Sequence, residues 1–375
     1  MKASDLKTLV DLLSPCLGDA ALLPVLGNIC FDVDGVYAYN DIVATCYRWE
    51  HGLGTFGVDG KPLLNLLSQY HKSDEEVKLR LLPDSILEVK IGRSVVKLPT
   101  LEQSAFIFEP PTKGSNVEAR IGRDKTERQR LRDVLEATAT SSVMPVYKAV
   151  VLGINKGHFD LMAFAANGPT MIHACVGKGK QAPAADQRWI VPKLAITQLL
   201  TALDVSGEDG GRLALSKEYL VGVCGDIIVT AKLLQDTVPN FYTPLQATSQ
   251  VTLEKWRTPE LLTALGVASA LGASYTGTVT TFQIEKQAMV LHTKGGKADA
   301  VDTIKLEKAC DNFNFSMDPN LFRKAFSFES LDGALKLNDA AAVFGDSKSF
   351  LFAAAFTGVR AKAAAPPVEE DKIPF

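Results

Sequence analysis

The sequence predicts an α+β protein in which one structural unit, two helices packed on antiparallel strands, occurs three times. The first observation is a helix with an apolar stripe followed by three short strands, a pattern that recurs three times along the chain. The second is another helix about 60 residues before each copy, and the starts of these helices lie about 120–130 residues apart. The third is the length of 375 residues, which suits two or three domains.

The recurring pattern begins with the helices Lys61–Tyr70, Pro192–Leu203 and Asp318–Phe328. Three strands follow each helix, at 77–82, 86–91 and 94–98, at 212–216, 219–224 and 227–234, and at 334–338, 341–344 and 349–356. Polar turns beginning with Gly92, Gly225 and Gly345 join the last two strands of each copy, and glycine supplies the positive φ that tight hairpins need. Apolar and polar residues alternate along the strands, which predicts antiparallel sheets with one solvated face.

The preceding helices are predicted at Ser4–Leu13, Asp124–Thr138 and Leu253–Leu271, each followed by further strands. Proline and glycine interrupt both the helical period and the strand alternation of apolar residues at Glu109–Ser115 and at Pro244–Gln250, which indicates linkers. We therefore expect domains over residues 1–112, 116–244 and 250–359, and a flexible, low-complexity tail over 360–375.

Composition excludes several classes of protein. Hydrophobic residues make up 46% of the chain, enough for a large core, and 40 Lys and Arg against 43 Asp and Glu exclude a uniformly basic coat. No apolar run reaches about 18 residues and no signal peptide is recognisable, so no membrane span is expected.

The six cysteines form no C-x-x-C pair, which favours buried free thiols in a reducing cytoplasm. The five histidines lack metal-ligand spacing, and P-loop, G-x-G-x-x-G and G-x-S-x-G motifs are absent, so we expect no enzyme, metal or cofactor.

Several segments, in order, resemble bacterial β-type DNA sliding clamps, the β subunits of DNA polymerase III. They are Leu23–Asn28 (LPVLGN), Gly92–Ser94 leading to Leu98–Leu101 (LPTL), Ile190–Lys193 (IVPK), and Gly225-Asp226 followed by Val238–Phe241 (VPNF). The resemblance covers about residues 1–360 and implies the DNA-clamp fold. It implies a homodimeric ring around duplex DNA, with helices lining the hole. Such a ring tethers DNA polymerase and is opened by a clamp loader. Departures from the family's motifs suggest a divergent, phage-encoded member working in the bacterial cytoplasm.

The central channel of such a ring needs positive charge without base readout. Lys125, Arg128 and Arg132 fall within an arc of about 60° on one helix. The resemblance extends this DNA-facing set to other basic positions expected on helices: Lys2, Lys7, Lys61, Lys193, Lys255, Arg257, Arg323 and Lys324. An ordinary solvated helix face is the alternative for each residue taken singly.

The resemblance also implies a hydrophobic pocket that receives short clamp-binding peptides of partner proteins. The matching positions are Gly168, Met171, Pro239, Pro244, Phe352, Ala354 and Phe356, the last three on one strand face by period two. The family's Thr-Asp-Gly-His-Arg-Leu is replaced by residues 166–171 (ANGPTM), and its terminal Met-Pro-Met by residues 354–356 (AAF). Simple core packing is the alternative interpretation.

The expected subunit interface joins the first domain of one protomer to the last domain of the other. The positions that match are Leu66, Tyr70, Arg93, Val96, Leu98, Leu271 and Ile304. Ring closure would cover edge strands that otherwise invite aggregation, although a monomer can blunt such edges with charged residues.

The tail ends Glu369-Glu370-Asp371-Lys372 and then Ile373, Pro374 and Phe375. This resembles the acidic Ile-Pro-Phe tip of bacterial single-stranded-DNA-binding proteins, and suggests recruitment of proteins that read such a tip; a solubilising tail is the alternative. A single-stranded-DNA-binding or replication-scaffold protein is the alternative function, but it predicts a small, aromatic-rich OB-fold rather than three related units.

Overall fold

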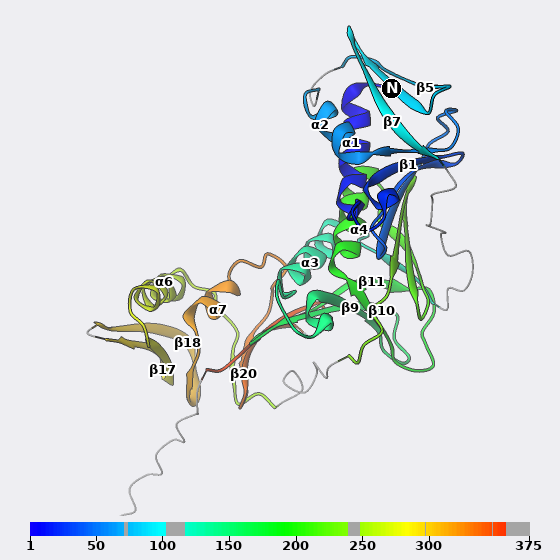
Figure 1. The fold of residues 1–375 in the computed structure, drawn as a ribbon. Coiled ribbons are helices and arrows are strands. Elements are labelled where there is room, and N and C mark those ends of the chain that lie inside the picture. Colours follow the sequence, from blue (N-terminus) through cyan, green and yellow to red (C-terminus); the bar gives the residue numbers. More distant parts are fainter. Residues whose placement is uncertain (71–73, 103–116, 239–247, 297, 347, 358–375) are drawn as a thin grey trace, which may run out of the picture. The chain divides into compact units, whose positions relative to one another are not determined.

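The computed structural model describes residues 1–70, 74–102, 117–238, 248–296, 298–346 and 348–357 (Figure 1). The chain divides into two compact units. Unit 1 contains Met1–Ala165 and Cys175–Val238, and unit 2 contains Ala166–Ala174 and the chain from Pro239 onward. The three predicted domain boundaries remain a prediction, and the first predicted linker, 109–115, lies outside the described residues.

The first repeat in unit 1 pairs two helices with two groups of strands. Its elements are α1 (Ala3–Leu13), β1 (Asn28–Asp32), β2 (Gly35–Tyr39), β3 (Val43–Arg48), β4 (Phe56–Asp59), α2 (Gly60–Ser68), β5 (Val77–Leu82), β6 (Ile86–Ile91) and β7 (Ser94–Glu102). The strands pair antiparallel in the order β3–β2–β1–β4–β7–β6–β5. Helix α1 packs against α2, and Leu6, Leu13 and Leu63 are fully buried between helices and sheet.

The second repeat, also in unit 1, has the same plan. Its elements are β8 (Val117–Ile121), α3 (Lys125–Glu136), β9 (Ala149–Ile154), β10 (Asp160–Asn167), β11 (Thr170–Gly179), β12 (Gln187–Pro192), α4 (Lys193–Ser206), β13 (Gly211–Leu215), β14 (Tyr219–Cys224) and β15 (Ile227–Lys232). Helix α3 packs against α4, while α4 covers β14 and β15. Asp124 caps α3, because its carboxylate accepts a hydrogen bond from the backbone N–H of Glu127.

The sheets of the two repeats are joined by antiparallel pairing of β3 with β15, from Val43 opposite Ala231 to Tyr47 opposite Ile227. A buried polar chain sits under this joint: the Thr45 hydroxyl lies 3.2 Å from the Cys16 thiol and donates to the Gln198 side-chain oxygen at 3.3 Å. Helices α1 and α4 both contact β3. The joint therefore fixes the two repeats as one body.

Unit 2 repeats the plan with longer strands. Its elements are β16 (Val251–Leu253), α6 (Pro259–Ser274), β17 (Val279–Gly295), β18 (Ala298–Ser316), α7 (Pro319–Lys324), β19 (Leu335–Leu337), β20 (Ala341–Asp346) and β21 (Phe350–Ala355), with the first half of β11. The order β16–β19–β20–β21–β11 forms one antiparallel sheet, and β17 and β18 form a hairpin. Its core is aromatic: Trp256, Phe322 and Phe344 lie within 6.0 Å of one another, centroid to centroid.

The predicted architecture of helix pairs on antiparallel strands is confirmed, and β5, β6 and β14 have the predicted bounds. Gly92, Gly225 and Gly345 have positive φ in the predicted turns. The helix predicted over Leu253–Leu271 is wrong at its start. Residues 251–253 pair with β19, and the helix begins at Pro259 because the Thr258 hydroxyl caps it by accepting from the N–H of Leu261.

Leu199 on α4 tests the packing of helix on sheet in unit 1. Its side chain is fully buried and fills the space above Gly222 on β14, where a Cβ atom would lie 2.1 Å from Leu199 Cδ2. Leu199→Ala leaves a cavity there, and we expect a loss of about 2–5 kcal/mol of unfolding free energy in urea. The control Leu22→Ala, at a side chain that is 76% exposed, should change stability by less than about 0.5 kcal/mol. Equal losses in the two variants would contradict this packing.

Candidate nucleic-acid interface

Four basic side chains on the helices are exposed and have no partner among the described residues. They are Lys61 on α2, Lys125 on α3, Lys193 on α4 and Arg323 on α7. Lys324 is half-buried, with its ammonium 5.8 Å from the centroid of the Phe328 ring. These cations can meet phosphate without first breaking an internal contact.

Other members of the expected DNA-facing set are paired within the molecule. Lys2 lies 2.8 Å from Asp74, Lys7 pairs with Asp11 on the next turn of α1, and Lys255 lies 2.9 Å from Glu307. Arg132 lies 2.7 Å from Asp204 across the α3–α4 pair. Exposed pairs of this kind contribute little to stability, so these cations can exchange partners, but their charge is already balanced locally.

Arg128 is a correction to that set. Its guanidinium donates to the carbonyl oxygens of Gly122 at 3.0 Å and of Leu203 at 3.2 Å, and also to that of Glu208. Leu203 lies in the last turn of α4, whose final carbonyls have no partners within the helix. Arg128 therefore ties the end of α4 to the start of the second repeat and is not a free channel cation.

Arg257 is the second correction and has the same function in unit 2. It lies in the turn before α6, not on a helix as predicted, and so does Lys255. Its guanidinium donates to the carbonyl oxygens that follow α7, those of Ala325, Phe326 and Phe328 at 2.8–3.2 Å, and to that of Leu331 at 2.9 Å. Arg128 lies in the first turn of α3, whereas Arg257 lies two residues before the start of α6. No short pattern in the sequence distinguishes either of them from a surface cation.

The expected peptide pocket is only partly assembled by the described residues. Gly168 lies in the turn before β11 with φ of 55°, and Met171 is opposite Ala353 of β21. Phe356 follows β21 and its ring lies 4.9 Å from that of Phe315. Phe352 and Ala354 are corrections, because both are fully buried and Phe352 packs on Phe328 and Phe344 in the core. Pro239 and Pro244 lie outside the described residues.

Two open strand edges match the expected subunit interface. In β7 the residues 94–99 pair with β6, and no other described strand pairs with them. Val96 and Leu98 are half-buried on this strand, and Leu66 is half-buried on α2. Arg93 is exposed, and the Tyr70 hydroxyl lies 3.1 Å from that of Ser94.

In unit 2, β18 pairs with β17 alone among the described strands. Leu271 is half-buried on α6, whereas Ile304 is only 7% exposed, so its side chain supports the hairpin from inside.

The thiols and acidic groups of the described residues show no reactive arrangement. All six cysteines are free, and burial raises the pKa of Cys30 to about 12 and that of Cys16 to about 11. No group of three or more His, Cys, Asp or Glu side chains is placed to hold a metal within the described ranges. Nor does any helix in the same ranges have the length and apolarity needed to cross a membrane.

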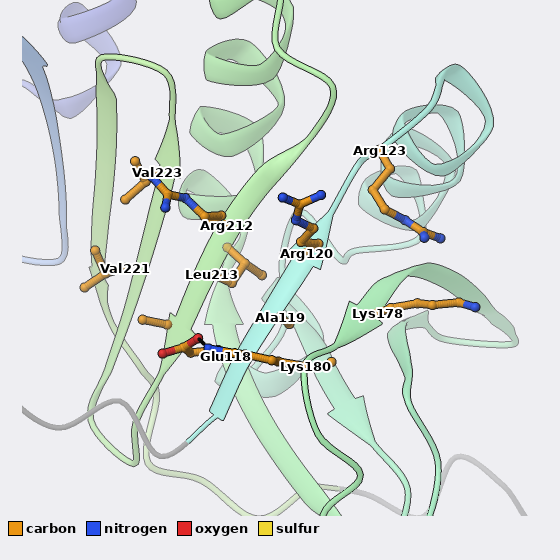
Figure 2. A pocket seen from close by; sticks show the side chains of 12 residues that line it. Glu118, Ala119, Arg120, Arg123, Lys178, Lys180, Arg212, Leu213, Val221 and Val223 are labelled. Carbon is orange, nitrogen blue, oxygen red and sulfur yellow. Dashed lines mark hydrogen bonds and ion pairs between the residues drawn. The ribbon is translucent and has the colours of Figure 1, made fainter.

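Sequence reasoning missed a second basic surface, on the sheet of unit 1. Arg120, Arg123, Lys178, Lys180 and Arg212 surround an open groove of about 700 Å³ on β8, β11, β13 and β14 (Figure 2). These residues are spread over 93 positions of sequence, from 120 to 212, and form no charge run. Only the strand register brings them together.

The three repeats, each with a helix pair on antiparallel strands, have the fold of solved bacterial DNA sliding clamps. The chain has a TM-score of 0.80 with a DnaN sliding clamp of Pseudomonas aeruginosa bound to griselimycin, at 16% identity, covering 96% of this chain and 98% of that chain. The TM-score is 0.79, at 13% identity, with a putative DNA polymerase III β subunit of Eubacterium rectale, covering 95% and 98%. For the Helicobacter pylori β clamp bound to a DNA ligase peptide it is 0.75, at 15% identity, covering 96% and 99%.

No protein-family model matches the sequence, and no curated protein matches it significantly. The chain has the DNA sliding-clamp fold over nearly its whole length, as the resemblance implied, at 13–16% identity to these structures.

Arg257→Met tests whether this arginine is structural. The substitution leaves the carbonyl groups around the end of α7 without their charged donor, so we expect unit 2 to lose about 1.5–3 kcal/mol of stability. Fluorescence of Trp256, whose ring lies 5.5 Å from the guanidinium carbon, reports the unfolding in urea. The matched variant Arg323→Met, at an exposed cation of the same unit, should change stability by less than about 0.5 kcal/mol. A stable Arg257→Met protein with weakened DNA binding would restore the channel assignment.

Proposed function

We propose that this protein is a DNA sliding clamp, a non-catalytic processivity factor that encircles duplex DNA and tethers a replicative DNA polymerase. The observation that carries the proposal is the clamp fold over 95–96% of the chain, with a helix pair in each repeat. A ring is held on DNA by topology, so its surface needs only weak, sequence-independent contacts. The alternative of a single-stranded-DNA-binding or scaffold protein is not favoured, because three clamp repeats replace the expected OB-fold.

The DNA contacts are assigned to the unpaired cations Lys61, Lys125, Lys193 and Arg323, with Lys324 beside them. Each occupies an α-helix of a helix pair, and lysine and arginine meet phosphate without reading bases. The paired cations Lys2, Lys7, Arg132 and Lys255 complete the set only when phosphate displaces their carboxylate partners.

The ring is proposed to be a homodimer in which β7 of one protomer pairs with β18 of the other. Both strands have an open edge among the described residues, and pairing supplies the missing backbone hydrogen bonds. Exposed apolar side chains accompany both edges: Val95 is 51% exposed and Val301 is 62% exposed. Covering them adds hydrophobic stabilisation to the backbone pairing.

Partner proteins are proposed to dock short peptides near Gly168, Met171 and Phe356. One clamp of the same fold is bound to a DNA ligase peptide and another to griselimycin, which supports a peptide-binding site in this fold. A clamp loader and a polymerase are the partners such a function requires, and the bacterial cytoplasm, of a host cell if the chain is phage-encoded, is the compartment. The tail residues Ile373, Pro374 and Phe375 lie outside the described residues, and their recruitment of proteins that read an Ile-Pro-Phe tip stays a prediction.

Retention on circular DNA tests the clamp function. Protein diluted to dissociate dimers and then concentrated with nicked circular plasmid should close around it and co-elute with it in gel filtration at 0.3 M salt. Linearising the plasmid should release it, because a ring slides off free ends. Lys125→Glu with Lys193→Glu should weaken binding to linear duplex in low salt, while Lys90→Glu with Lys336→Glu, at exposed strand positions, should not. Retention on linear plasmid with free ends would contradict encirclement.

The interface is tested by the mass in solution. The protomer mass is 40.4 kDa, and we expect a wild-type mass near twice that value. Val96→Asp places a charge on the edge of β7 that the partner strand would cover, so the mass should fall to that of the protomer. Lys90→Asp on the neighbouring strand β6 is the control and should stay dimeric. A monomeric wild-type protein, or a dimeric Val96→Asp protein, would reject this interface.

A further inference from the structure

Three cations form one cross-strand row on the sheet of unit 1. In the register of the strands, Lys178 of β11 lies opposite Arg120 of β8, and Arg120 lies opposite Arg212 of β13. All three side chains are exposed, whereas Leu213, the next residue on β13, is buried and lies close to Gly222 beneath Leu199 of α4. The row therefore occupies the face of the sheet that is turned away from the helices (Figure 2).

This row is unfavourable unless an anion covers it. Like charges directly opposite each other on neighbouring strands destabilise a sheet. Within the described residues, none of the three cations has a hydrogen-bonded or ion-paired carboxylate. The nearby Glu118 instead accepts from the Lys180 ammonium at 2.8 Å, and Arg123 pairs with Glu127. Glu118 also interacts electrostatically with Arg212, so it compensates part of the charge at that end of the row. The charges of Arg120 and Lys178 are available to a ligand.

The groove beside the row has an apolar wall. Ala214 on β13 and Val221 and Val223 on β14 are half-buried, with Val223 opposite Arg212 and Val221 opposite Ala214. Together, cations and apolar side chains line about 700 Å³ of open groove, enough for several residues of an extended peptide. An occupant that fits both walls must carry several negative charges and an apolar end.

One segment of this chain has that chemistry. Residues 369–375 contain three acidic side chains against one lysine, and Ile373, Pro374 and Phe375 supply the apolar part. We propose that this acidic segment, residues 369–375, of a second copy of the chain docks in the groove formed by Arg120, Lys178, Arg212, Val221 and Val223.

The spacing of charges fits an extended peptide. Neighbouring strands lie about 4.8 Å apart, so Lys178 and Arg212 are separated by about 10 Å across the row. In an extended segment Glu369 and Asp371 project on the same side, about 7 Å apart, within reach of two such long side chains. A nucleic acid fits less well, because the row is only three strands wide and ends at valines and at the carboxylate of Glu118.

Photocrosslinking in the full-length protein tests the proposal. Phe375 is replaced by the photoreactive benzoylphenylalanine, and crosslinked peptides are mapped by mass spectrometry. We expect crosslinks to β8, β13 and β14 around the groove that join two copies, which mixed isotope-labelled samples identify; crosslinks confined to one chain would contradict the proposal. Arg120→Glu with Arg212→Glu should reduce their yield at least tenfold. The matched double variant Arg80→Glu with Lys336→Glu, at exposed strand positions outside the groove, should retain it.

A second measurement separates loss of docking from loss of folding and from other ligands. Charge reversal in the tail, at Glu369, Glu370 and Asp371 to Lys, leaves the described fold untouched and should reduce the crosslinks as strongly, whereas raising the salt should reduce them progressively. Crosslinks that map elsewhere, or that persist in the Arg120→Glu, Arg212→Glu protein, would overturn the proposal. Unchanged crosslinks together with lost binding of a single-stranded oligonucleotide in that variant would assign the groove to nucleic acid instead.

Discussion

The pairing of β3 with β15 is the constraint on which the rest of unit 1 depends. It converts the sheets of two repeats into one hydrogen-bonded surface and removes two edges that would otherwise be open. Beneath it, the Thr45 hydroxyl contacts the Cys16 thiol and donates a hydrogen bond to the Gln198 side-chain oxygen. The polar groups buried at the joint therefore have hydrogen-bond partners. Because α1 and α4 rest on the same joint, the positions of the helices and of their basic residues follow from this one strand pairing.

Much of this architecture is predictable because the repeat imposes the same pattern three times. Alternation over Leu87–Ile91 and a glycine at each turn define hairpins locally, and the structure reproduces them. The start of α6 was not predictable from the apolar pattern, because the alternation over Val251-Thr252-Leu253 covers only three residues, and its pairing with β19 decides for strand. The Thr258-Pro259 pair is the local signal that marks the start of the helix.

The candidate site was less predictable than the fold, for a reason of chemistry. The sequence does not distinguish a long cationic side chain that faces solvent and can bind phosphate from one that donates hydrogen bonds to the end of a neighbouring helix. Arg128 and Arg257 cap the carbonyl ends of α4 and α7, over sequence separations that no local pattern reveals. Arg120, Lys178 and Arg212 present the opposite case, since each looks like an isolated surface residue until the strand register aligns them.

The 40 Lys and Arg residues of this chain, balanced by 43 Asp and Glu, are used in two different ways. Arg128 and Arg257 each use a fixed fork of donors to satisfy several carbonyl groups, and this commits both side chains to the fold. Among the described residues, lysines carry most of the unpaired charge on the helices, as at positions 61, 125 and 193, where a flexible, hydrated ammonium has no internal partner. Rigid contacts to carbonyl groups and exposed charges without an internal partner thus place different demands on a cationic side chain, and the planar guanidinium and the flexible ammonium meet them in different parts of the fold.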